Sequence, residues 1–182
     1  QYIDELIRSG KKRVVLQFNR LDFRLSWIRQ HYPRAKIIHI YRHPREQWLS
    51  YIKNSERCSP ANNLSSLGSQ DFFYLRRWGR DLRYVFPFFE EDRLSHLYEL
   101  CYLFWRLSYH PGAPYVNYSV SMEDLSKKTE ASLSEIFSIV GIDDKYMSQG
   151  LSKVQDIKPQ QWQNYAEDKW FKDLESRCET AL

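Results

Sequence analysis

The segment 36–53 (KIIHIYRHPREQWLSYIK) combines residue types that suit phosphate binding. Arg42 directly follows a short apolar run, and Pro44 favours the first turn of a helix, where its missing N–H is not needed. A guanidinium holds a phosphate through two parallel hydrogen bonds, and a helix N-terminus adds free N–H groups. Arg45 is the second arginine of the turn, and Ser50 lies eight positions after Arg42, where its hydroxyl could reach the same anion. By residue type alone, Arg42 could equally be a surface or ion-pair residue.

Apolar runs and helical patterns alternate through the first third of the chain. The expected elements are a helix at 1–9 ending at Gly10, a strand at 13–18, a helix at 21–31, a strand at 36–41 and a helix at 44–53. Short β-branched runs indicate buried strands, and apolar residues at helical spacing indicate helices. This order predicts a parallel sheet flanked by helices. Ligands collect at the carboxyl ends of such strands, which is where Arg42 would lie.

The rest of the chain continues the pattern with more helix. We expect a polar loop at 55–70, helices at 71–86 and 93–110, a strand at 115–119 and a helix at 129–140 capped by Gly141. The aromatic and arginine-rich stretch 72–89 could line an acceptor pocket, or it could be core with arginines reaching to the surface. The fold class predicted is α/β, a three-layer parallel sheet flanked by helices, in a single domain over residues 1–182.

Composition limits the class of protein. With 182 residues, 42% of them hydrophobic, the chain can form one compact domain, and its net charge of +4 favours an anionic ligand without requiring nucleic acid. No apolar run approaches the roughly 20 residues that span a membrane. Cys58, Cys101 and Cys178 are widely separated, so we expect reduced thiols, a cytoplasmic location and no metal site. The chain starts within an amphipathic pattern without Met, so we expect it to be truncated at the N-terminus.

The string KIIHIYRHPREQWLSYI resembles the 3′-phosphate-binding motif of sulfotransferases that use PAPS (3′-phosphoadenosine 5′-phosphosulfate). That motif is a hydrophobic strand, an Arg, a polar-Pro-Arg turn and a Ser eight positions after the Arg. RVVLQFNR with LSWIRQHYPRAKIIHI, and YVNYSVSMEDL with a helix ending IVGI, are similar to other parts of the family, so the resemblance covers about residues 10–165. It implies a P-loop NTPase-like sulfotransferase fold that moves a sulfuryl group from PAPS, without a metal, to a hydroxyl or amine of a small-molecule or glycan acceptor.

Site residues are carried over position by position. The resemblance implies that Arg42 and Ser50 bind the 3′-phosphate. Arg45 in the turn and Arg20, just after the 13–18 strand, are further candidates for cofactor binding. Lys153 could supply a late basic contact to the 3′-phosphate.

The sequence departs from the family at the catalytic residues. No His stands near Asn19, where some members have a catalytic one, and Gln17 occupies a position where the family often has Lys. The Pro-x-Ser-Gly-Thr-like loop that holds the 5′-phosphosulfate is absent from the sequence, so we expect it upstream. Two alternatives therefore remain: a catalytically inactive nucleotide-binding domain of the same fold and, less favoured, a protein that binds single-stranded nucleic acid.

Overall fold

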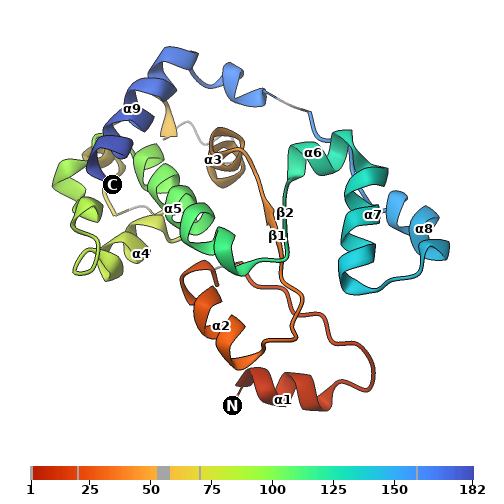
Figure 1. Cartoon of the computed structure of the whole chain (residues 1–182). Coiled ribbons are helices and arrows are strands. Elements are labelled where there is room, and N and C mark those ends of the chain that lie inside the picture. The colour runs from red at the N-terminus through yellow and green to blue at the C-terminus, as the bar shows by residue number, and fades with distance from the viewer. Residues whose placement is uncertain (1, 20, 53–57, 70, 159) are drawn as a thin grey trace.

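A computed structural model describes residues 2–19, 21–52, 58–69, 71–158 and 160–182 (Figure 1). These residues are mostly helical, and their one sheet is a pair of parallel strands, β1 (Ile38–Tyr41) and β2 (Tyr118–Ser121), in register from Ile38 opposite Tyr118 to Tyr41 opposite Ser121. The prediction of a three-layer parallel sheet, and with it the P-loop NTPase-like sulfotransferase fold, is wrong for this structure. Of the three expected strands, those at 36–41 and 115–119 are present as β1 and β2, and their parallel direction is as expected.

The expected strand at 13–18 is what the sheet lacks. This segment is without regular secondary structure, and Val15 is 85% exposed while Phe18 is 42% exposed. Arg13 Nη2 donates a hydrogen bond of 3.0 Å to the carbonyl of Gly141, which ties the segment to the end of helix α7 (Thr129–Val140). A β-branched run forms a buried strand only when a neighbouring strand and a covering layer are present, and here the described residues supply neither.

The expected helices are present, with several of their bounds changed, and further helices are found beside them. Their bounds are α1 Tyr2–Ser9, α2 Leu25–His31, α3 Pro44–Ile52, α4 Leu75–Leu82, α5 Leu97–Gly112, α6 Met122–Lys127, α7 Thr129–Val140, α8 Met147–Leu151 and α9 Asp168–Ala181. The helices expected at 1–9, 44–53 and 129–140 are confirmed over 2–9, 44–52 and 129–140, and those expected at 21–31, 71–86 and 93–110 form over 25–31, 75–82 and 97–112. Gly141 has the left-handed conformation of a helix end (φ 67°). Within the loop expected at 55–70, residues 55–57 and 70 lie outside the described residues, and Leu64–Leu67 form a 3-10 turn.

Helix α5 is the centre of the core. It packs against α3, α4 and α9, whereas α6, α7 and α8 form a second group next to β2 (Figure 1). Trp48 of α3 and Phe171 of α9 are completely buried against this cluster. Part of the aromatic stretch 72–89 belongs to the core, because Trp78 stacks on Phe104 at 4.1 Å. Phe73 in the same stretch remains 52% exposed. In the described part of the chain, no helix is both long and apolar enough to cross a membrane.

The start of α5 depends on a neutral histidine. His96 is 5% exposed; its Nδ1 accepts the Tyr98 N–H at 3.0 Å, and its Nε2 lies 3.3 Å from the Ser59 carbonyl. Nδ1 must accept, so the proton sits on Nε2 and donates to Ser59. Burial lowers the pKa of His96, with the Ser59 carbonyl and the Glu99 carboxylate opposing the shift. Folding therefore favours the uncharged ring.

We expect a fall in stability at mildly acidic pH that depends on His96. The unfolded imidazole takes up a proton near pH 6.5 and the folded one only at lower pH, so the contribution is complete above about 6.5 and is lost as pH falls toward the folded pKa. His96→Asn keeps a cap acceptor without a titrating ring. Denaturant midpoints at pH 7.5 and 5.5 should differ less for this variant than for the wild type. Equal differences would contradict the account.

Candidate functional site

The turn between β1 and α3 lies at the carboxyl edge of the sheet. The two strands are parallel, so β1 leads into Arg42 and α3 at the same edge where β2 leads into α6. The His43 carbonyl accepts the Gln47 N–H at 2.9 Å, which makes His43 the N-cap residue directly before α3. From α5, the Trp105 indole N–H donates to the Arg42 carbonyl at 2.9 Å. The backbone of the turn is thus fixed from the core side.

The Arg42 guanidinium is held loosely. Its Nη2 lies 3.4 Å from Glu46 Oε2, and its Nε lies 3.9 Å from Glu123 Oε1, beyond hydrogen-bond distance. Arg42 Nε is buried and has no hydrogen-bond partner among the described residues, although the side chain as a whole is 25% exposed. A buried donor without an acceptor costs about 1–3 kcal/mol, which makes this nitrogen a place where an anion would be stabilised.

A carboxylate already lies at the start of α3. Both oxygens of Glu123, in the first turn of α6, accept the His43 N–H, at 3.2 and 3.4 Å. The α6 turn is itself fixed, because the Ser121 hydroxyl accepts the Asp124 N–H at 2.9 Å. The seat formed by Arg42 Nε and the His43 N–H, hereafter the anion seat, therefore faces a negative charge supplied by the chain itself.

Arg45 occupies a different environment. Its guanidinium makes three contacts of 2.7 Å, two to Glu175 and one to Asp168, and lies 4.6 Å from the centre of the Trp162 ring. Burial alone lowers the pKa of Arg45, but the hydrogen bonds that its guanidinium donates to Glu175 and Asp168 outweigh burial and raise the pKa above its ordinary value. Tyr98 adds a hydrogen bond of 2.6 Å to Glu175. The structure therefore gives Arg45 the contacts of a buried ion-pair residue that joins α3 to α9.

The remaining cofactor candidates are spread out. Ser50 is exposed on α3. The buried Glu46 lies between Ser50 and Arg42, because the three residues follow one another at intervals of four along one ridge of the helix. Lys153 is exposed beyond the end of α8, and its ammonium group has no ion pair in the part of the chain that the structure describes. Arg20 lies outside the described residues. Arg42 thus precedes α3 while Ser50 is the seventh of its nine residues, so the structure brings neither Ser50 nor Lys153 to the Arg42 guanidinium.

Sequence reasoning missed three residues at the turn. Glu46 stands four positions after Arg42, a spacing that favours ion pairs along a helix, so this contact could have been found. Glu123 follows β2 as Arg42 follows β1, and the parallel pairing that was expected implies that they meet. Trp105 is distant in sequence, and nothing in its surroundings marks it as the residue that fixes the Arg42 carbonyl.

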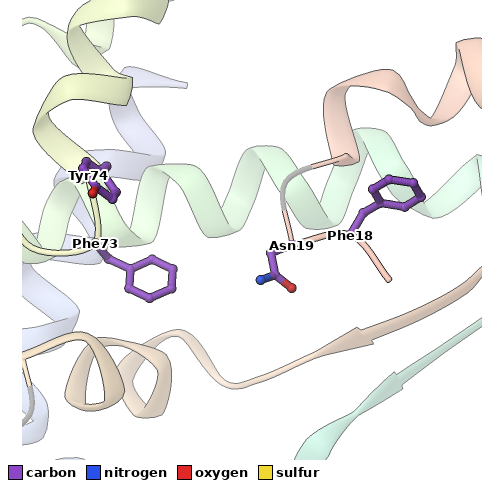
Figure 2. Close-up of a pocket in the computed structure, with 4 residues that line it drawn as sticks. All are labelled: Phe18, Asn19, Phe73 and Tyr74. Carbon is purple, nitrogen blue, oxygen red and sulfur yellow. The ribbon is translucent and has the colours of Figure 1, made fainter. Parts of the chain in front are cut away.

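An open aromatic cleft lies near helix α3 (Figure 2). It has a volume of about 480 Å³ and is lined by Phe18, Asn19, Phe73 and Tyr74. Phe73 and Tyr74 both have left-handed backbone conformations (φ 56° and 59°), which are unfavourable for aromatic residues. The Phe73 ring stacks on Tyr51 of α3 at 4.6 Å, so one wall of the cleft adjoins the helix that begins at the anion seat.

Comparison with known proteins identifies no relative of this chain: no family model, no curated protein and no solved structure matches it.

Proposed function

We propose that Arg42 and the His43 N–H, directly before α3, bind the 3′-phosphate of an adenine nucleotide, and that the protein is a sulfotransferase that uses PAPS as its sulfuryl donor. The observation that carries the proposal is the buried Arg42 Nε without a hydrogen-bond partner among the described residues. It lies beside the N-terminus of a nine-residue helix, at the carboxyl edge of a parallel strand pair. Helix N-termini and guanidinium groups together favour phosphate over neutral ligands.

The residues of the anion seat fit one phosphate group. A phosphate oxygen could accept from Arg42 Nε and another from the His43 N–H, and Trp105 holds the intervening backbone in place. Ser50, eight residues after Arg42 on the same helix, is the further candidate contact that the motif supplies. PAPS would supply the activated sulfuryl group, and this chain's part in the proposal is to bind and orient the nucleotide through its 3′-phosphate. No catalytic base is assigned.

We place the acceptor, a small molecule or a glycan, in the aromatic cleft. Exposed ring faces offer apolar contact to a ring-shaped ligand, and the Asn19 amide offers hydrogen bonds. Two consecutive left-handed aromatic residues are costly, and strained backbone concentrates at binding sites. A cytoplasmic location is part of the proposal, because Cys58, Cys101 and Cys178 are all buried free thiols.

The cleft makes a prediction in which stability and binding change in opposite directions. Tyr74→Gly should raise the free energy of unfolding by about 1 kcal/mol, because glycine adopts the left-handed conformation without strain and the Tyr74 ring is 62% exposed. The same change should weaken acceptor binding. Urea denaturation measures the first effect. Tyr84 is a matched control. Like Tyr74, which lies under Arg77, it is exposed and lies under an arginine, but its φ is not positive. Tyr84→Gly should therefore not raise the free energy of unfolding.

The experiment that tests the function is direct. Calorimetry should detect binding of adenosine 3′,5′-bisphosphate, and Arg42→Ala should weaken it. Transfer of radiolabelled sulfate from PAPS to an acceptor would then separate an enzyme from a nucleotide-binding domain without catalysis. Binding of oligonucleotides with a steep salt dependence, together with no effect of Arg42→Ala on nucleotide affinity, would instead support a nucleic-acid-binding protein.

A further inference from the structure

We propose that Glu123 is an internal competitor for the anion seat: its carboxylate occupies the position that the 3′-phosphate takes, and the ligand must displace it. This inference rests on the proposed function of the same site. It assigns Glu123 a role in tuning affinity and release that neither the motif nor its carried-over residues contain.

The first argument is position. Glu123 approaches the seat from α6, while Arg42 and His43 belong to the β1–α3 turn, so the carboxylate reaches across from a separate element. Its oxygen accepts a hydrogen bond from the His43 N–H and lies 3.9 Å from Arg42 Nε, and these are the two donors that the phosphate would use. A group that shares donors with the ligand and sits on another element can move aside without disturbing the turn itself.

The second argument is the weakness of these contacts. The Glu123 oxygens lie 3.2 and 3.4 Å from the His43 nitrogen and 3.9 Å from Arg42 Nε. By contrast, Glu175 and Arg45 meet at 2.7 Å in two places. Charge-assisted hydrogen bonds that stabilise a structure are short, at about 2.7–2.9 Å. The Glu123 side chain is also 20% exposed, so water can solvate it when it leaves. Glu123 therefore occupies the seat without being fixed in it.

The third argument is charge. A phosphate monoester carries up to two negative charges and three acceptor oxygens, whereas the carboxylate carries one charge and two oxygens. The phosphate can satisfy Arg42 Nε, which Glu123 leaves without a hydrogen bond. A nucleotide with a 3′-phosphate therefore displaces Glu123. Its affinity is lowered by the cost of that displacement and by repulsion from the displaced carboxylate nearby.

The test is Glu123→Gln, with binding measured by calorimetry and dissociation by stopped flow. The variant should bind adenosine 3′,5′-bisphosphate about fivefold to tenfold more tightly, with slower dissociation, since it removes a partly solvated negative charge a few ångströms from the ligand. Affinity for adenosine 5′-monophosphate, which lacks the 3′-phosphate, should be unchanged. Glu130→Gln removes the same charge from an exposed position on α7 and should match the wild type.

A second variant keeps the test decisive. Glu123→Asp shortens the side chain and withdraws the carboxylate from the His43 N–H, so it should give a smaller increase in affinity than Gln. If neither variant binds adenosine 3′,5′-bisphosphate more tightly while Arg42→Ala still weakens binding, the inference is wrong and the phosphate site stands. If Arg42→Ala leaves wild-type affinity unchanged, the proposed function fails and the inference with it.

Discussion

Arg45→Ala is expected to lower the free energy of unfolding by about 3–5 kcal/mol, the range for removing one partner of a buried ion pair. The substitution leaves the partly buried Glu175 beside Tyr98 without its cation, and Asp168 loses its 2.7 Å hydrogen bond. Because Arg45 joins α3 to α9, the C-terminal helix should separate from α5 first. Chemical denaturation followed by circular dichroism measures the loss of stability, and amide hydrogen exchange in α9 shows where unfolding begins.

A surface arginine provides the control for this prediction. Arg80 contacts Glu91 at 3.0 Å, but its side chain is 53% exposed, so Arg80→Ala should cost no more than about 1 kcal/mol. Similar losses of stability for the two variants would show that the ion pairs of Arg45 contribute no more to stability than an exposed pair does. Because Arg45 is engaged with carboxylates, its replacement should also leave nucleotide affinity unchanged wherever the variant remains folded.

Arg42→Ala should have the opposite pattern: it should weaken nucleotide binding strongly and lower stability less. A hydrogen bond to a charged group contributes about 1.5–3 kcal/mol, so the variant should bind adenosine 3′,5′-bisphosphate about tenfold to a hundredfold more weakly. Its loss of stability should be smaller than that of Arg45→Ala, because Arg42 makes a single contact of 3.4 Å to the buried Glu46 and lies 3.9 Å from the partly exposed Glu123, whereas Arg45 makes three contacts of 2.7 Å. Calorimetry and urea denaturation on the same preparation measure both quantities.

Arg42→Lys sharpens this prediction. Lysine keeps the charge but cannot place two parallel N–H groups against a phosphate, so it should recover only part of the affinity. Full recovery would mean that charge alone holds the ligand and that the buried Nε is not involved. A large loss of stability in Arg42→Ala would instead indicate that Arg42, like Arg45, is chiefly a structural ion-pair residue.

Local structure around the site was predictable, and the surrounding architecture was not. Pro44 and the apolar run before Arg42 correctly indicated a strand followed by a helix, since these signals act over a few residues. The apolar run at 13–18 looks much the same in sequence, yet Val15 is exposed. Whether such a run becomes a strand depends on partners far away in the chain, and the described residues pair only β1 with β2.

The two arginines of the turn show that distant contacts within a site could not be predicted from the sequence either. Arg42 and Arg45 were both candidates for phosphate binding from sequence, with Arg42 favoured by the motif. Their difference comes from α9, more than a hundred residues later, which brings Glu175 and Asp168 to Arg45 and none of its carboxylates to Arg42. Spacing along one helix indicates which side chains share a face, but it does not reveal which of them a distant helix neutralises.

The central claim is that the anion seat selects a 3′-phosphate, and one comparison tests it most directly. Wild-type protein and Arg42→Ala are titrated by calorimetry, at the same salt concentration, with adenosine 3′,5′-bisphosphate and with adenosine 5′-diphosphate, which carries both of its phosphates on the 5′ side. We predict that the wild type binds the 3′,5′-bisphosphate at least tenfold more tightly and that the preference disappears in Arg42→Ala. Equal affinity of the wild type for the two nucleotides would contradict the account.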